Sequence, residues 1–171
     1  MEWVEAFRAT SIGHLEGEYL PRIERALEVL PADALWWSPH PDATSVGVLL
    51  RHLEGNVRQW ILGGLGGEAG QRERAAEFAG APNAAASELR DRLAATVREA
   101  AKVIGSLDGE RLLAPVRIQG FDTTGLAAVY HVVEHFSWHT GQIAWIAKAR
   151  AAEGHGLAYY DEDAINSPPP E

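Results

Sequence analysis

Three of the seven histidines stand at intervals of four residues, at positions 131, 135 and 139. In a helix, that spacing places side chains on nearly one stripe of the surface. Imidazole acts as a general acid or base near neutral pH and as a ligand of divalent metals. Because the sequence contains no cysteine, cysteine-held zinc and thiolate nucleophiles are excluded. Histidine, aspartate and glutamate remain as possible metal ligands.

A helical wheel indicates where this stripe points. Glu134 lies on a polar side of the helix, whereas His135 and His139 fall on the opposite side among apolar residues such as Val132. We therefore expect His135 and His139 to face the core. His131 lies further round the wheel, at the boundary of the buried surface.

The same treatment of an earlier segment places His52 and Asn56 on an inward face with Leu53. The opposite face is expected to be solvated and carries Arg51, Glu54 and Arg58. An unsatisfied buried polar group costs roughly 1–3 kcal/mol, so inward imidazoles need partners. A divalent cation bound by neutral imidazoles, with an open position for water, satisfies three of them together. The alternative is a set of core histidines that hydrogen-bond to protein groups without a metal.

Four segments with helical periodicity are expected to position these residues. In the first, 2–30, Pro21 is expected to kink or divide the helix. The second begins after Ser45 as N-cap, and the glycine run at 63–67 ends it. The remaining expected elements are a third helix over about 83–104, a strand or extended arm at 115–119, and a fourth helix from 123 or 124 to about 152.

These segments predict an all-α four-helix bundle over residues 1–160, followed by a flexible, acidic and proline-rich tail at 161–171. A length of 171 residues fits one domain, and a hydrophobic content of 46% is enough for a core. The first residues lack the pattern of a secretory signal, and no apolar run is long enough to span a membrane. We expect a cytoplasmic protein.

The charge balance argues against two classes of partner. With 15 Lys and Arg against 24 Asp and Glu, the net charge is −9, which repels nucleic-acid phosphates and anionic lipid headgroups. We therefore expect no nucleic-acid partner and no membrane partner. Arginines 72, 74, 90, 92 and 98 are interleaved with acidic residues and are expected to form a solvated face.

Two stretches resemble the signatures of the DinB-like superfamily, and in particular an uncharacterised bacterial branch of it. They are residues 45–61, SVGVLLRHLEGNVRQWI, and residues 130–143, YHVVEHFSWHTGQI. The sequence between them from 63 to 78 also resembles that branch, as do the tryptophans at 36 and 37 and residues 157–160. The resemblance therefore covers nearly the whole chain.

The resemblance implies a four-helix bundle in up-down-down-up order, often dimeric, that holds a divalent metal. Carried over onto this sequence, the ligands are His52, His135 and His139. Imidazole nitrogen suits zinc or nickel better than calcium or magnesium. The residues expected around the ligands, in supporting or packing roles, are Asn56, His131 and Gln142.

Some members of the superfamily transfer or isomerise substrates with bacillithiol, mycothiol or glutathione, and others are described as metal-dependent hydrolases. The resemblance therefore implies Lewis-acid activation of a small thiol, or of water. No inward carboxylate lies near the ligands on either helix, which weakens hydrolysis more than thiol transfer. A metal-binding or stress-related bundle without catalysis, and a structural bundle without metal, stay open as alternatives.

A homodimer is expected mainly from the resemblance, and secondarily from the number of tryptophans. Six tryptophans are more than one small core readily buries. Trp60, Trp138 and Trp145 stand at helical spacings and are expected to pack in the core or at a subunit contact.

Overall fold

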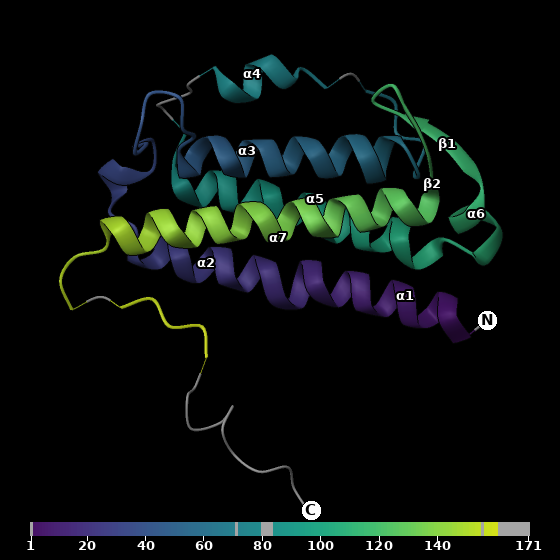
Figure 1. The fold of residues 1–171 in the computed structure, drawn as a ribbon, viewed down its shortest axis with the longest axis horizontal. Helices are drawn as coiled ribbons and strands as arrows, with labels where there is room; N and C mark the ends of the chain where they lie inside the picture. The colour runs from purple at the N-terminus through teal and green to yellow at the C-terminus, as the bar shows by residue number, and fades with distance from the viewer. Residues whose placement is uncertain (1, 71, 80–83, 155, 161–171) are drawn as a thin grey trace, which may run out of the picture.

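The computed structural model describes residues 2–70, 72–79, 84–154 and 156–160. Four long helical rods lie side by side, and a short helix and a β-hairpin lie outside them (Figure 1). The first and last rods run in one direction, and the second and third run in the opposite direction (Figure 1). The predicted up-down-down-up helical bundle is thus confirmed, with a small hairpin added.

The first rod consists of α1 (Glu2–Ile12), a π-helical stretch η1 (Gly13–Tyr19) and α2 (Leu20–Val29). Pro21 stands in the first turn of α2, and the N–H of Leu20 bonds to the carbonyl of Leu15, five residues back. Proline has no N–H to continue an α-helical ladder, so the wider turn just before it takes up the break. The expected break at Pro21 is therefore a change from π-helical to α-helical geometry just before this residue, and the rod continues without an interruption.

The second rod begins after a 3₁₀ turn η2 (Ala32–Ala34) and consists of α3 (Val46–Val57) and the π-helical η3 (Arg58–Gly63). Ser45 is the N-cap, as predicted, and its hydroxyl accepts a hydrogen bond from the N–H of Val48 at 3.3 Å. The rod ends in the glycine run, where Gly67 has a φ of +74°.

The chain then crosses the outside of α3 through α4 (Arg74–Phe78), a helix that the periodicity does not predict (Figure 1). The third rod, α5 (Ala86–Ser106), matches the predicted third helix to within a few residues. A second unpredicted short helix, α6 (Gly109–Leu113), follows, and the side chain of Asp108 caps it.

The segment before the last rod is an antiparallel hairpin of β1 (Pro115–Ile118) and β2 (Phe121–Thr124). Its turn residues Gln119 and Gly120 have φ values of 54° and 85°, as a tight two-residue hairpin turn requires. The first strand was predicted as a strand or arm, whereas the second was not predicted. Thr124 ends β2 and caps the last rod, α7 (Gly125–Arg150), where the sequence places that helix start.

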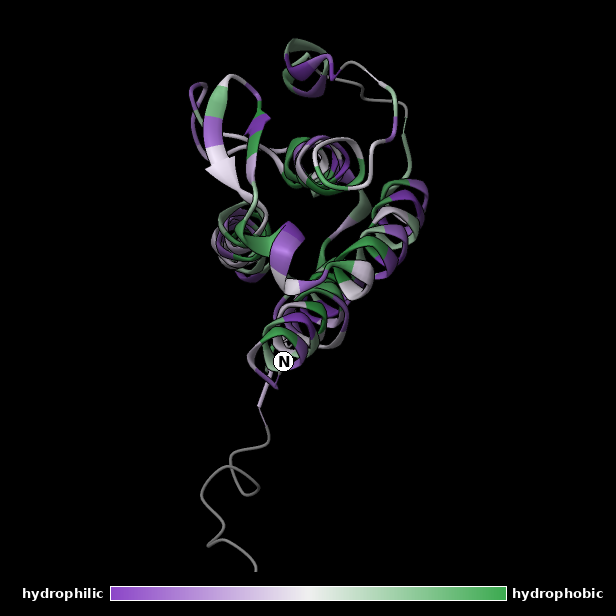
Figure 2. Cartoon of the chain, turned by 90° about the vertical axis from the view of Figure 1, so that its right-hand side faces the viewer, coloured by the Kyte–Doolittle hydropathy of each residue, from purple (hydrophilic) through white to green (hydrophobic). Residues whose placement is uncertain are grey.

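The core fills the space between the four rods. Figure 2 looks along them and shows hydrophobic and hydrophilic residues alternating around the helices, as amphipathic helices require. Phe136 of α7 is fully buried, and its ring stacks on Tyr19 of the first rod with centroids 6.2 Å apart. No helix in the described ranges is long and apolar enough to cross a membrane.

The last described residues return to the first rod. Leu157 is buried, and the hydroxyl of Tyr159 donates to the carbonyl of Arg22 at 3.2 Å. The guanidinium of Arg22 donates to the hydroxyl of Tyr160 at 2.7 Å. The predicted tail, 161–171, lies outside the described residues.

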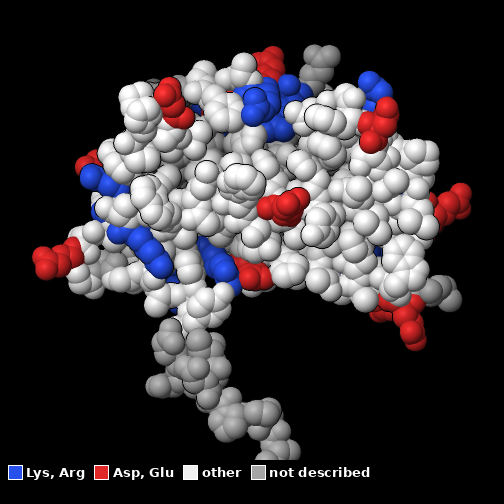
Figure 3. All heavy atoms as spheres, in the orientation of Figure 1, with Lys and Arg blue, Asp and Glu red and all other residues white. Residues whose placement is uncertain are grey.

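The tryptophans divide between core and surface. Trp60 is buried, whereas Trp138 and Trp145 of α7 are 69% and 59% exposed. Of the two predicted alternatives, packing in the core of this chain is therefore wrong for Trp138 and Trp145. Packing at a subunit contact stays a prediction for both. Figure 3 shows an acidic side chain near the middle of the face carrying α7, surrounded by uncharged residues. The homodimer itself stays a prediction.

Candidate metal centre

Two neighbouring rods bring the three predicted ligands together. His52 projects from α3, and His135 and His139 project from α7, which packs against α3. The Nε2 atom of His135 lies 3.1 Å from Nε2 of His52 and 3.0 Å from Nε2 of His139. One ligand atom from each residue falls within 4.8 Å of the other two. The structure therefore joins residues that are 83 positions apart in the chain.

Burial makes these imidazoles neutral at pH 7. His52 is 7% exposed, and the other two are half-buried. Burial, followed by the neighbouring His139 and His52, lowers the pKa of His135 to about 3. Burial also lowers the pKa of His52 and that of His139 below the usual histidine value. Neutral imidazole is the form that binds a metal.

The arrangement fits a divalent cation that accepts nitrogen ligands. Two nitrogens bound to one tetrahedral zinc at about 2.05 Å lie about 3.3 Å apart, close to the 3.0 and 3.1 Å separations found here. A proton on Nε2 of His135 can form a hydrogen bond within only one of these two Nε2 pairs. The nitrogen cluster can therefore hold a metal ion, and three protein ligands leave a further position open.

Gln142 supports one ligand directly. Its side-chain oxygen lies 2.6 Å from Nδ1 of His139, so the ring proton of His139 sits on Nδ1 and donates to that oxygen. The Nε2 lone pair of His139 then faces the cluster. Gln142 is itself exposed, so it reaches His139 from the solvent side of α7.

His131 and Asn56 lie beside the cluster, and neither belongs to it. The His131 ring lies against Trp60, with centroids 4.1 Å apart, and stacks on His135 at 5.6 Å. Asn56 is buried, with Nδ2 3.4 Å from Nε2 of His131. Within the described part of the chain, Oδ1 of Asn56 has no hydrogen-bond partner. His131 therefore lies between His135 and Trp60, and Asn56 contacts it from α3.

Residues 72–79, which cross the outside of α3 and are called the crossover segment below, supply two further residues beside His52. Neither was predicted as part of the site. Glu77 of α4 is buried, and its Oε2 lies 2.9 Å from Nδ1 of His52. The side chain of Arg72 is 7% exposed and donates to both carboxylate oxygens of Glu77, at 2.6 and 2.7 Å. The expectation of a solvated Arg72 is therefore wrong. Arg74, Arg92 and Arg98 are exposed, as predicted. The expectation of a solvated Glu54 is wrong, because this side chain is buried and pairs with Arg58 and Arg92.

The charge state of Glu77 follows from these contacts. Burial alone raises the pKa of this carboxyl, but the hydrogen bonds from Arg72 and His52 outweigh burial and lower the pKa below its usual value. Glu77 is therefore an ionised carboxylate at pH 7. It contacts Nδ1, on the side of the His52 ring away from the cluster. Nη2 of Arg72 lies 3.1 Å from the same Nδ1. The helices α3 and α7 carry no sequence signal for these two contacts, because Glu77 and Arg72 both come from the crossover segment.

The fold and the histidine cluster define the class of the protein as a four-rod helical bundle with a histidine cluster that could hold a metal ion. A solved structure with the same fold is a DinB-like protein, YjoA, from Bacillus subtilis, with 16% sequence identity and a TM-score of 0.61. The match covers 84% of this chain and 94% of that chain.

Residues 6–156 match the family described as "Protein of unknown function (DUF1572)", and the chain belongs to that family. Comparison with curated proteins gives no match.

Proposed function

We propose that this protein binds one divalent cation, zinc or nickel, through Nε2 of His52, His135 and His139. The observation that carries the proposal is the convergence of three Nε2 atoms, with neighbouring separations of 3.0 and 3.1 Å. Imidazole ligands favour such borderline cations over calcium and magnesium. The lowered histidine pKa values keep the ligands in the form that binds.

We further propose that the protein is an enzyme that transfers a small thiol to an electrophile. A divalent cation at such a site stabilises a bound thiolate at neutral pH. The three histidines come from two rods and leave an open position for the thiol. The Glu77 carboxylate lies behind the His52 ring and is held by Arg72, so it is not placed to deprotonate a water on the cluster side. Thiol transfer is therefore favoured over hydrolysis.

Metal reconstitution followed by a turnover assay tests both statements. After loading with zinc or nickel at neutral pH and desalting, we expect about one equivalent of metal per chain. With a low-molecular-weight thiol and a chromogenic aryl halide, we expect metal-dependent formation of the sulfur–carbon bond with release of halide and a proton. Retention below about a tenth of an equivalent contradicts the metal site. Bound metal without turnover identifies the alternative, a non-catalytic metal-binding or stress-related protein.

The bound metal is expected to be lost at acid pH. Protons compete with the cation for Nε2, and the lowered pKa values of the ligands mean that protonation requires a pH below the usual histidine value of about 6.5. Metal content after dialysis should be constant between about pH 8 and 7 and fall below about pH 6. Elemental analysis of samples dialysed across this range checks the expectation. Loss that is already complete at pH 7 contradicts it.

A further inference from the structure

Side chains of the crossover segment pack directly against the backbone of α3 at Gly55. Gly55 stands one turn after His52 on the outer side of α3, and a Cβ at this position would overlap Oε1 of Glu77 and lie 3.0 Å from Nε of Arg72. Glycine in a helix interior is less stable than alanine. Here the missing side chain leaves the space in which the Arg72–Glu77 ion pair sits against the helix.

The ion pair has a defined geometry. The guanidinium of Arg72 donates to both oxygens of Glu77 and, through Nη1, to the side-chain oxygen of Gln59 at 3.0 Å. Such two-point contacts fix the carboxylate in position and orientation. Oε2 of this fixed carboxylate faces Nδ1 of His52 at 2.9 Å.

This contact decides which ring nitrogen of His52 carries the proton. A carboxylate paired with Arg72 through both oxygens only accepts hydrogen bonds, so the proton between Oε2 and Nδ1 belongs to Nδ1. Nη2 of Arg72 also lies 3.1 Å from Nδ1, but its two protons have acceptors in Oε2 of Glu77 at 2.7 Å and the carbonyl of His52 at 3.4 Å. A neutral imidazole has one ring proton, and Nε2 of His52 therefore keeps its lone pair. That lone pair is the one that faces the histidine cluster.

We propose that Arg72 and Glu77 are positioning residues of the metal centre. Glu77 accepts the Nδ1 proton of His52, and Arg72 holds the carboxylate, so that His52 presents an unprotonated Nε2 to the cation. This inference rests on the proposed metal site. The other two ligands differ: His139 is oriented by Gln142 of its own helix, and Nδ1 of His135 is buried without a partner in the described ranges.

The first test is the tautomer of His52 in the metal-free protein. Nitrogen-15 NMR of the histidine rings distinguishes Nδ1–H from Nε2–H, and loss of a signal in His52→Asn assigns it. At pH 7.5 we expect wild-type His52 to be the Nδ1–H form and Glu77→Ala to contain the Nε2–H form. Glu77→Gln, which keeps an acceptor oxygen, should restore most of the Nδ1–H form. A wild-type spectrum with the proton on Nε2 overturns the inference without any variant.

The second test is metal affinity, measured by competition with a chromophoric chelator. Loss of an outer partner of a metal-bound histidine costs about 10–100-fold in affinity, and we expect this loss in Glu77→Ala. Gly55→Ala should weaken binding in the same direction, because the new Cβ displaces the ion pair while keeping both residues. Circular dichroism confirms that each variant is folded.

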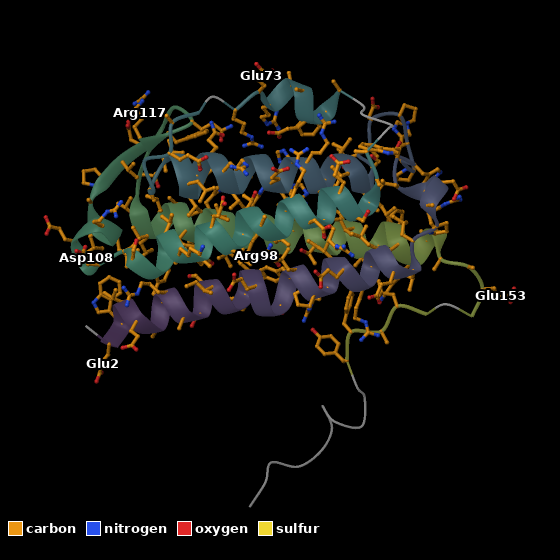
Figure 4. The ribbon with its side chains drawn as sticks, turned by 180° about the vertical axis from the view of Figure 1, so that it is seen from behind. Glu2, Glu73, Arg98, Asp108, Arg117 and Glu153 are labelled. Carbon is orange, nitrogen blue, oxygen red and sulfur yellow. The ribbon has the colours of Figure 1, made fainter. Side chains whose placement is uncertain are left out.

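Glu73→Ala is the matched control. Glu73 precedes α4, is exposed, makes no side-chain cap and points away from α3 (Figure 4). It should leave the tautomer and the affinity unchanged. If the wild type binds no metal, the proposed function fails while the tautomer measurement still decides the positioning role. If the wild type binds metal and Glu77→Ala binds it equally well, the positioning role fails and the metal site stands.

Discussion

His135→Ala is expected to abolish tight metal binding. His135 is the central ligand, because its Nε2 is the atom that lies within 3.1 Å of both other Nε2 atoms. Its loss leaves two nitrogens on different rods, which cannot fix one tetrahedral cation. The affinity for zinc or nickel should fall by more than about 100-fold, beyond the loss expected for an outer partner of a ligand. Chelator competition and metal content after desalting measure this effect.

The controls are histidines that lie elsewhere in the fold. His14 pairs with Glu18 of its own rod at 2.7 Å, and Nδ1 of His40 accepts from the N–H of Asp42 at 3.1 Å. His14→Ala and His40→Ala should retain the full metal content. His155, the third such control, lies outside the described residues. A His135→Ala protein that binds metal as tightly as the wild type contradicts the proposed site.

The three clustered histidines, His52, His135 and His139, were predictable from the sequence because each lies on a long helix. Over the 26 residues of α7, the helical period accumulates enough apolar positions to define an inward face. The same holds for α3, whose N-cap at Ser45 sets the register of His52. The resemblance then paired the two faces, which periodicity alone does not do.

The Arg72–Glu77 pair was not predictable in the same way. The helix α4 has five residues, too short for a period to separate an inward from an outward face. Glu77 meets His52 across 25 residues of chain, and that approach depends on the absence of a side chain at Gly55. The arginines look alike in sequence, and only the path of the crossover distinguishes buried Arg72 from its exposed neighbours.

The second strand was missed for a related reason. Residues 121–124 stand directly before a strong helix, and threonine serves equally well as a strand residue and as an N-cap. Thr124 does both, since it pairs with Pro115 and caps α7. The hairpin also brings Gln119 to Trp60, where its side-chain oxygen accepts from the indole N–H at 3.1 Å. The hairpin thus holds the indole ring that packs against His131.

Phe136→Ala is expected to cause a large loss of stability. Phe136 is fully buried on α7, follows His135 in sequence, and stacks on Tyr19. Removing a buried aromatic ring leaves a cavity and costs about 3–5 kcal/mol. That is a large part of the roughly 5–15 kcal/mol that stabilises a typical domain. Denaturant unfolding of the metal-free protein, at one fixed protein concentration, measures the difference.

Ser137→Ala, at the next and exposed position of α7, is the matched control and should change the free energy of unfolding by no more than about 0.5 kcal/mol. Metal provides a second readout, because a ligand that binds only the folded state stabilises it by about 2.7 kcal/mol at 100 times its Kd. If the cavity in Phe136→Ala leaves the neighbouring ligands in place, zinc should stabilise the variant and the wild type by similar amounts. A Phe136→Ala protein with wild-type stability would contradict the packing of α7 against the first rod, on which the orientation of His135 and His139 depends.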